Sequence, residues 1–200
     1  MRVGGIILAA GGSTRMGQTK QLLETDGKPL VVRVAREVLQ GGADPVVVVL
    51  GCEAKLCASA LKDLPVVTAI NESWEEGQAS SLRVGIEALQ RNFPAVNAAL
   101  ITLCDQVNLR ASVISDLIAI QRATGKGIVA SQYAGALGVP ALFTEHYFTQ
   151  IASLRGDRGA RAIIEQARKD LAVVPFPDGA IDLDTPDDYA AWRENRGPRG

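Results

Sequence analysis

An apolar run near the start of the chain leads directly into a glycine-rich loop, and this junction constrains the fold more than any other stretch. Residues 3–8 carry no polar side chain, so they predict a buried β-strand. Three glycines follow at positions 11–17, where the backbone must turn sharply and approach another group closely. Amides in such a loop can point at a phosphate, and Arg15 and Lys20 supply positive charge. The junction therefore predicts a strand followed by a phosphate-binding loop.

This loop differs from the two commonest phosphate loops. A Walker loop ends in Gly-Lys-Ser/Thr, whereas Lys20 is followed by Gln21. Gly11, Gly12 and Gly17 do not have the G-x-G-x-x-G spacing of dinucleotide-binding loops. A plain turn needs one or two glycines and no fixed cations, so we favour a nucleotide-phosphate cradle over a simple turn.

Composition limits the kind of protein and its partners. Two hundred residues suit one domain over 1–200, with a polar tail from about 193 that we expect to fray. A net charge of −1 argues against general nucleic-acid or membrane-surface binding. Three cysteines without metal-ligand spacing indicate a reducing, cytoplasmic location, and no stretch is long enough to span a membrane.

Apolar runs alternate with helical stripes along the chain. This pattern predicts a doubly wound, mostly parallel α/β sheet in a single domain. Strands are expected at 3–8, 45–50, 66–70, 96–103, 127–133 and 171–174, and helices from Pro29 to Gly41, from 53 to 61 and from about 111 to 123. The break at 135–138, followed by a return over 139–143, predicts a small antiparallel excursion beside the sheet.

Residues 8–20 resemble the signature L-A-A-G-x-S-x-R-M-G-x-x-K of the nucleotidyltransferases that act on the molybdenum cofactor. The double alanine Ala9-Ala10 is similar to the cytidylyltransferase branch, whereas the guanylyltransferase branch more often carries Leu-Ala-Gly-Gly. The resemblance implies that Arg15 and Lys20 hold the outer phosphates. It implies nucleotide contacts from Leu8, Ala9, Ala10, Gly11, Gly12, Ser13 and Gly17.

A second glycine-serine segment lies at 71–83, before a helical stripe. Ser80 or Ser81 would sit near the helix N-terminus, where a serine cap is worth about 1 kcal/mol. Capping alone does not require Gly77 or paired serines. The segment is similar to the family's G-x-x-S-S element, so the resemblance implies that Gly77, Ser80 and Ser81 help to hold base and ribose.

A carboxylate follows the fourth expected strand. Open α/β sheets bind ligands at the carboxyl ends of their strands, which is where Asp105 lies. Mg²⁺ bound to triphosphate oxygens is its natural partner, because Mg²⁺ takes one or two carboxylates and fills its shell with phosphate and water. An N-cap role for Asp105 is the alternative. The family has Asp-Gln-Pro here, whereas this chain has Val107 in place of the proline.

Two further aspartates are candidates for the same metal. Residues 181–184 alternate, which predicts that Ile181 and Leu183 face the core while Asp182 and Asp184 face the opposite way. Either aspartate could approach the metal on Asp105.

A loop with three arginines precedes a late helix. It resembles the family's G-D-x-G-A-R element, which implies contacts to a phosphorylated acceptor from Gly156, Asp157, Arg158 and Arg161. The alternative is a helix cap at Asp157 with solvated arginines, and the sequence leaves both open.

The resemblance implies transfer of CMP from CTP to the terminal phosphate of the molybdopterin cofactor, with Mg²⁺ bound and pyrophosphate released. The attacking phosphate monoester is largely dianionic at neutral pH, since its second pKa is about 6, so no general base is needed. Three alternatives remain: a guanylyltransferase, a cytidylyltransferase of isoprenoid synthesis, which usually has Pro-Lys-Gln where this chain has residues 19–21, and a non-catalytic carrier that delivers the pterin cofactor to an apo-dehydrogenase.

Overall fold

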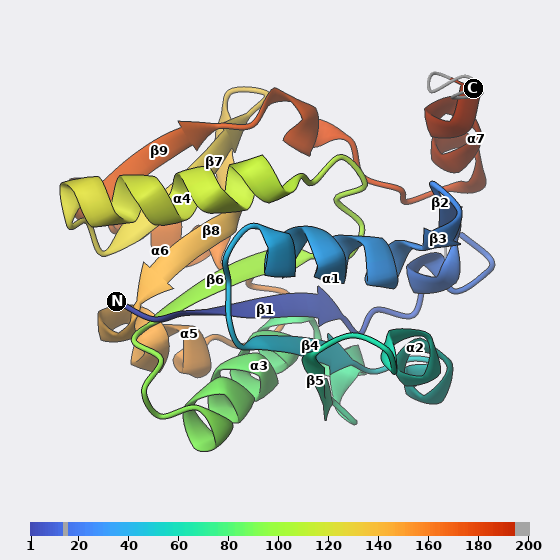
Figure 1. Cartoon of the computed structure of the whole chain (residues 1–200), viewed down its shortest axis with the longest axis horizontal. Coiled ribbons are helices and arrows are strands. Elements are labelled where there is room, and N and C mark those ends of the chain that lie inside the picture. Colours follow the sequence, from blue (N-terminus) through green and yellow to red (C-terminus); the bar gives the residue numbers. More distant parts are fainter. Residues whose placement is uncertain (14–15, 195–200) are drawn as a thin grey trace.

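The computed structural model describes residues 1–13 and 16–194, and a seven-stranded sheet forms its centre (Figure 1). The strands run in the order β5-β4-β1-β6-β8-β7-β9. Every pairing is parallel except those that β8 makes with β6 and β7, so the predicted α/β class is confirmed. The bounds are β1 (Val3–Ala9), β4 (Val46–Leu50), β5 (Val66–Ile70), β6 (Ala98–Leu103), β7 (Ile128–Tyr133), β8 (Ala136–Thr144) and β9 (Leu171–Pro175).

The antiparallel excursion lies within the sheet rather than beside it, which corrects the expectation from sequence. Ala98 to Ile101 of β6 pair with residues 141–144 of β8, and β7 pairs with the other edge of β8. The central residues of β8, from 140 to 143, are all buried. A strand whose successive residues are all apolar can be covered by helices on both faces of the sheet. It is therefore stable in the interior of a sheet.

Helices cover both faces of the sheet (Figure 1). One apolar layer contains residues of α1, α2 and α4, and the other contains residues of α3, α5 and α6. The helices are α1 (Leu30–Gln40), α2 (Ala54–Leu61), α3 (Gln78–Asn92), α4 (Ala111–Thr124), α5 (Phe148–Ser153), α6 (Arg161–Gln166) and α7 (Pro186–Glu194). Pro29 precedes α1 instead of beginning it, because it belongs to a short antiparallel hairpin of β2 (Glu24–Thr25) and β3 (Lys28–Pro29).

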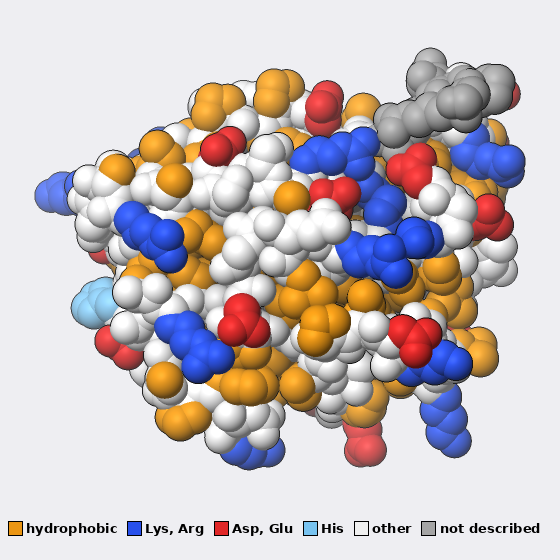
Figure 2. Space-filling view, viewed as in Figure 1, with side chains coloured by type: hydrophobic (Ala, Val, Ile, Leu, Met, Phe, Trp, Pro, Cys, Tyr) orange, Lys and Arg blue, Asp and Glu red, His pale blue; other side chains and the backbone are white. Residues whose placement is uncertain are grey.

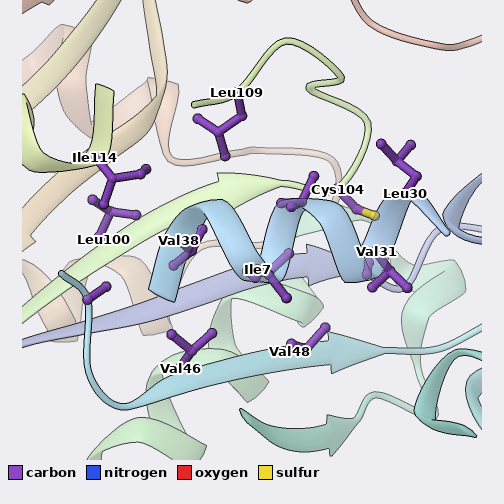
Figure 3. Packing of buried hydrophobic residues seen from close by; sticks show 14 of the residues in the cluster. Ile7, Leu30, Val31, Val38, Val46, Val48, Leu100, Cys104, Leu109 and Ile114 are labelled. Atoms are coloured by element: carbon purple, nitrogen blue, oxygen red, sulfur yellow. The ribbon is translucent and has the colours of Figure 1, made fainter. Parts of the chain in front are cut away.

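The packing of α1 on the sheet fixes the central strands. Val31 and Val38, two turns apart on α1, are fully buried and lie over Ile7 of β1 and over Val46 and Val48 of β4 (Figure 3). Burying one such side chain stabilises the fold by about 1.5–3 kcal/mol. The carboxyl ends of β1 and its neighbours are therefore held by a dense core.

The surface carries both signs of charge. On the face shown in Figure 2, Lys and Arg side chains are interspersed with Asp and Glu. Within the described part of the chain, no helix is long and apolar enough to cross a membrane. Of the tail from about 193, Arg193 and Glu194 belong to α7, and the remainder lies outside the described residues.

Candidate active site

The candidate site lies at the carboxyl ends of β1 and β6. These strands pair in parallel with Leu8 opposite Leu103, so the glycine loop after β1 and Asp105 after β6 leave the sheet side by side. The same end of the sheet carries the β2–β3 hairpin and α7 (Figure 1). The topology therefore brings together the loop and the carboxylate that the sequence singled out.

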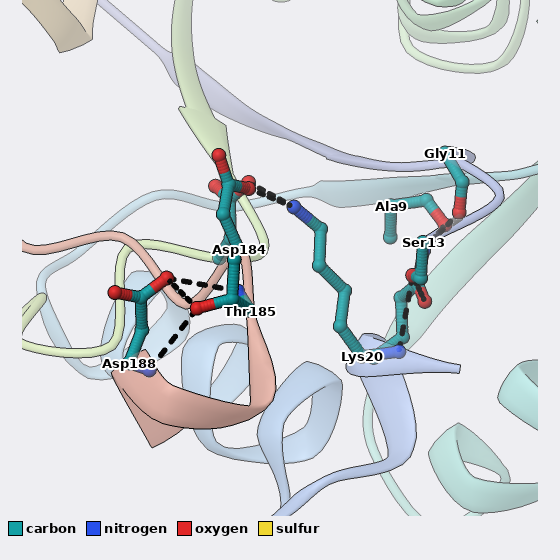
Figure 4. Close-up of polar contacts among 9 residues, drawn as sticks. Ala9, Gly11, Ser13, Lys20, Asp184, Thr185 and Asp188 are labelled. Atoms are coloured by element: carbon teal, nitrogen blue, oxygen red, sulfur yellow. Dashed lines mark hydrogen bonds and ion pairs between the residues drawn. The ribbon is translucent and has the colours of Figure 1, made fainter. Parts of the chain in front are cut away.

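The buried amide of Gln21 holds the glycine loop from inside. Its Nε2 donates to the carbonyl oxygens of Gly11 at 2.8 Å and Ala9 at 3.1 Å. Ser13 Oγ donates to Gln21 Oε1 and accepts from the Lys20 amide at 3.1 Å, as part of the contacts in Figure 4. The family motif implies a nucleotide contact from Ser13, and the sequence predicts no role for Gln21. In the structure both fix the shape of the loop.

The amides at the start of the glycine loop, those of Gly11, Gly12 and Ser13, have no acceptor within the described part of the protein. A Cβ placed on Gly11 would meet no atom within 4 Å, whereas one on Gly12 would lie 2.8 Å from the Trp74 indole. Gly11 thus leaves room for a ligand, and Gly12 is required by the close approach of Trp74. Gly17 is needed for another reason, a left-handed φ of +68°.

Two cations were assigned to this loop, and the structure describes one of them. Arg15 lies outside the described residues. Lys20 extends from the end of the loop to the carboxylates, where its Nζ lies 2.6 Å from Asp105 Oδ2 and 3.2 Å from Asp184 Oδ1 (Figure 4). Burial lowers the pKa of Lys20, but the two carboxylates outweigh it, so the pKa lies above its ordinary value.

Asp105 does not cap a helix, and one of its carboxylate oxygens has no partner among the described residues. Its Oδ1 is buried without a hydrogen-bond partner. The capping alternative is wrong, because α4 begins at Ala111 and the Ala111 amide donates to Glu37 Oε2 at 2.7 Å. The absence of the family's proline does not prevent a tight turn, since the Val107 amide donates to the Asp105 carbonyl at 2.7 Å.

Two further side chains hold the turn after β6. Gln106 accepts from Thr102 Oγ1 at 2.9 Å and donates to the Val139 carbonyl at 2.7 Å, which ties the turn to β8. Arg33 of α1 donates to the Val107 carbonyl. Sequence analysis gave neither residue a role. Both are buried polar side chains that only the packed structure reveals.

The alternation predicted for 181–184 is only partly observed. Leu183 is buried, but Ile181 is 47% exposed, because residues 177–180 form a 3₁₀ turn and no strand follows. Asp184 reaches Lys20, whereas Asp182 does not. Burial and the neighbouring Asp105 and Asp184 carboxylates raise the pKa of Asp182 to about 6, so it lies within their electrostatic reach.

These residues fit a divalent cation that shares its shell with phosphate. No group of three or more His, Cys, Asp or Glu side chains among residues 1–13 and 16–194 is arranged to hold a metal. Asp105 and Asp184, however, both contact one ammonium, and one oxygen of Asp105 has no partner. Mg²⁺ is bound by one or two carboxylates together with substrate phosphates in many enzymes, which matches this donor set.

The paired serines at the start of α3 have partners within the protein. Ser80 Oγ accepts from Asn71 Nδ2 and donates to the Gly77 carbonyl, both at 2.8 Å, and Ser81 Oγ accepts from Asn71 at 2.9 Å. Gly77 has a φ of +104°. The serines thus hold the 71–77 loop beside the glycine loop, and their contact with base and ribose remains a prediction.

The residues of the arginine loop at 155–161 lie in two different surroundings. The Gly156 carbonyl accepts from the Ala79 amide at 3.0 Å, and Asp157 lies against Gly77, so this part of the loop adjoins the start of α3. Arg161 lines a pocket near the carboxylates. Arg158 lines a separate hollow beside α5 and α6, so the structure does not bring it into that pocket.

The pocket near the carboxylates has a volume of about 170 Å³ and a mainly apolar lining. Tyr133 stands at its wall and donates to the Val139 carbonyl at 3.1 Å. Burial and the nearby Asp182 raise the pKa of Tyr133. Leu103 at the end of β6, two residues before Asp105, also lines the pocket, so the pocket adjoins the carboxyl end of that strand. Its lining comprises Leu8, Gln78, Leu82, Ile101, Leu103, Tyr133, Ala136, Leu137, Gly138, Val139, Gly159, Ala160 and Arg161.

Comparison with known proteins identifies the family. Residues 5–171 match the MobA-like NTP transferase domain, so the chain belongs to this family of nucleotidyltransferases. The resemblance that the sequence motifs indicated is thereby confirmed at family level.

Three relatives carry different names. The chain is 33% identical over 175 residues to nicotine blue oxidoreductase of Paenarthrobacter nicotinovorans, covering 82% of each. It is 28% identical over 195 residues to the purine catabolism protein PucB of Bacillus subtilis (strain 168), covering 92% of this chain and 93% of the relative. It is 28% identical over 141 residues to a probable molybdenum cofactor guanylyltransferase of Opitutus terrae, covering 70% of this chain and 65% of the relative.

Solved structures show the same architecture. Rv0371c from Mycobacterium tuberculosis H37Rv is 28% identical, with a TM-score of 0.82 and coverage of 97% of this chain and 98% of that one. A complex of Rv0371c with manganese is 26% identical, with a TM-score of 0.79 and coverage of 97% and 99%.

Proposed function

We propose that this protein is a Mg²⁺-dependent cytidylyltransferase that transfers CMP from CTP to the terminal phosphate of the molybdopterin cofactor and releases pyrophosphate. The observation that carries this proposal is the meeting of the open glycine loop, Lys20 and Asp105 at the ends of β1 and β6. Family membership and the relative named as a molybdenum cofactor guanylyltransferase support it.

Each part of the site has a task in this reaction. The amides of the glycine loop bind phosphate oxygens, and the Lys20 ammonium compensates the charge on the leaving pyrophosphate. Arg15, four residues into the loop from Gly11, is proposed to do the same. Mg²⁺ held by Asp105 and Asp184 would neutralise the phosphates and polarise the α-phosphate. Catalysis then consists of positioning and charge neutralisation, with no general base.

The pocket beside the carboxylates suits the acceptor. Its apolar lining accepts a flat ring system, while Arg161 at its wall can pair with a phosphate. Gly156 and Asp157 shape the neighbouring loop. In this assignment Arg158 has no direct contact with the acceptor, because it lines the hollow beside α5 and α6.

The preference for CTP rests on Ala10. Ala10 is buried in the apolar layer beneath the loop, and its methyl group takes space that the glycine of guanine-using relatives would leave to a larger base. Ala10 is held in place, since its carbonyl accepts from the Cys52 amide at 3.0 Å. The Gly77–Ser81 segment offers hydrogen bonds to the edge of the base. Polar edges left unpaired by the wrong base can discriminate by as much as about 10⁴-fold.

In this proposal the protein forms its product in the cytoplasm. The described cysteines Cys52, Cys57 and Cys104 are free thiols, which suits a reducing compartment. The recipient would be an apo-molybdoenzyme of the dehydrogenase type. Neither nucleic acid nor a membrane surface is a proposed partner.

The decisive experiment is product analysis with purified protein, Mg²⁺, molybdopterin cofactor and each of CTP, GTP, ATP and UTP. We expect a cytidylylated cofactor and stoichiometric pyrophosphate with CTP. Equal or better use of GTP would assign the protein to the guanylyltransferase branch. Binding of the cofactor without nucleotide turnover would support the carrier alternative.

Asp105→Asn tests the metal ligand. The amide cannot compensate the metal charge, so we expect turnover to fall by about two orders of magnitude or more with the fold retained. Asp116→Asn, on the exposed side of α4, is the matched control and should be unaffected. Near wild-type turnover by Asp105→Asn would remove Asp105 from the metal site.

One relative is named as an oxidoreductase, so redox turnover is tested in parallel. Reduction of a nicotine blue-type dye, measured by the loss of its visible absorbance, should not occur if the site transfers nucleotides. Dye reduction in the absence of nucleotidyl transfer would replace the proposed function with a redox one.

A further inference from the structure

Lys20 lies between the carboxylates that a divalent cation would use. Its Nζ contacts Asp105 Oδ2 at 2.6 Å and Asp184 Oδ1 at 3.2 Å. The side chains of Lys20 and Asp105 are each only 16% exposed, so solvent screens their contact poorly. Asp105 Oδ1 is buried without a hydrogen-bond partner, which leaves one carboxylate oxygen available to a further cation.

We propose that Lys20 is a resident counter-ion, which a divalent cation displaces from Asp105 and Asp184 when it enters with a nucleotide. The released ammonium then binds the triphosphate. This inference rests on the proposed function, because it uses the same metal and nucleotide sites. The lysine ammonium sits on a flexible stem with three rotatable donors, so it can exchange one set of oxygens for another while the backbone stays fixed.

The exchange makes metal binding depend on the nucleotide. A free divalent cation has to break the shielded Lys20–Asp105 ion pair and the more exposed Lys20–Asp184 pair, and it leaves a largely buried ammonium without a partner, which is costly. A cation that arrives on a triphosphate brings phosphate oxygens for its own shell and new acceptors for the ammonium. The wild-type protein is therefore expected to bind free metal weakly and metal-nucleotide tightly.

The proposal predicts opposite effects from a single substitution. Lys20→Met keeps the length of the apolar stem and removes the charged ammonium. Removal of a like charge from the metal position is expected to tighten binding of free Mn²⁺ by about tenfold or more. The same variant loses its contact with the outer phosphates, so its use of CTP should fall. A lysine that only binds phosphate would leave the affinity for free metal unchanged.

Mn²⁺ binding is measured without nucleotide by the electron paramagnetic resonance signal of the free ion, at pH 8 to keep the carboxylates ionised. Lys62→Met, at the exposed end of α2, is the matched control and should bind Mn²⁺ as the wild type does. Unchanged or weaker Mn²⁺ binding by folded Lys20→Met would overturn the proposal.

A second measurement uses the wild-type chain, in case Lys20→Met does not fold. Amine acetylation is quantified residue by residue by mass spectrometry, with and without saturating Mn²⁺. Labelling of Lys20 should rise with Mn²⁺, while labelling of Lys62 stays constant. Constant labelling of Lys20 at saturation would overturn the exchange. Both measurements use metal without nucleotide. A negative result would therefore overturn the exchange without contradicting nucleotidyl transfer, and a positive result does not depend on which nucleotide or acceptor the protein uses.

Discussion

At the scale of single residues, buried amide side chains shape the site as strongly as the charged groups do. Gln21 is 1% exposed and binds two carbonyls of the glycine loop. Asn71 holds both serines at the start of α3, and Gln106 joins β6 to β8. A side-chain amide both donates and accepts, so it can hold two neighbouring groups at once. The shape of the glycine loop and of the neighbouring segments therefore depends on residues that lie outside the proposed phosphate contacts.

Gln21→Glu tests this role. The substitution keeps the shape but replaces the donor with an acceptor that faces the carbonyls of Ala9 and Gly11. Leaving the buried Ala9 carbonyl and the partly buried Gly11 carbonyl without this donor should lower the free energy of unfolding by about 2 kcal/mol. Urea unfolding measures the loss, and nucleotide titration should show weaker binding of triphosphate.

The control for Gln21→Glu is Gln150→Glu on the exposed side of α5. It makes the same chemical change at the surface and should leave both measurements unchanged. If the two variants were equally stable and bound nucleotide equally well, the Gln21 amide would not be shaping the loop.

At the scale of elements, one carboxylate joins three segments on the side of the sheet away from the site. Asp170, just before β9, accepts from the Gly127 amide before β7 and from the Tyr147 hydroxyl before α5, both at 2.9 Å. The Gly127 and Tyr147 hydrogen bonds favour the charged form and hold the pKa of Asp170 below its ordinary value. Burial and the bond to Asp170 raise the pKa of Tyr147 to about 12, so Tyr147 stays a donor at neutral pH.

The lowered pKa gives the sign of a pH effect. The folded state prefers the ionised carboxylate more than the unfolded state does, so the stabilisation is present above the ordinary value of 3.8 and is lost as pH falls through the lower folded value. Asp170→Asn should lower the free energy of unfolding by about 1–2 kcal/mol at pH 7. The difference from wild type should shrink when pH falls below about 4.

Chemical unfolding at pH 7 and at pH 3.5 measures this difference. Asp63→Asn, an exposed site after α2, serves as the control and should show neither effect. A stability difference for Asp170→Asn that grows at acid pH would show that the sign is wrong.

At the scale of the whole molecule, stability is distributed unevenly around the site. Every residue of β1 and β4 is buried, and β1 has a hydrogen-bonded strand on each side. Helix α7 contributes one buried residue, Trp192, and the Tyr189 hydroxyl joins it to the Glu24 carbonyl at 2.7 Å. Asp184 lies two residues before α7, so one of the two proposed metal ligands belongs to this weakly held segment, whereas the other, Asp105, follows the central strand β6.

Native-state hydrogen exchange tests this distribution. Amides of β1, β4 and β6 should exchange last, through global unfolding, while those of α7 should exchange through local opening at much lower free energy. Exchange measured by mass spectrometry with and without Mg²⁺ and nucleotide should show α7 slowing when the site is filled. Protection of α7 equal to that of β1 in the free protein would contradict the expectation.

The sequence alone determined the class of fold and the location of the glycine loop, because both follow from local patterns. Runs of apolar residues predicted β5 at 66–70 without error, and helices α2 and α4 to within one residue. Glycines and cations placed the loop directly after β1. The motif in this loop also indicated the nucleotidyltransferase family, and the match over residues 5–171 confirmed it.

Only the tertiary structure decided which distant groups meet. It placed β8 inside the sheet, joined Lys20 to Asp105 and Asp184, brought Arg161 rather than Arg158 to the pocket, and left Ile181 exposed. Strand order and ion-pair partners depend on contacts between residues far apart in the chain. The free energy of such contacts cannot be predicted from a short stretch of sequence. From sequence alone, a buried amide such as that of Gln21 cannot be told from a polar residue at the surface. Its hydrogen-bond partners are determined only when the chain packs around it.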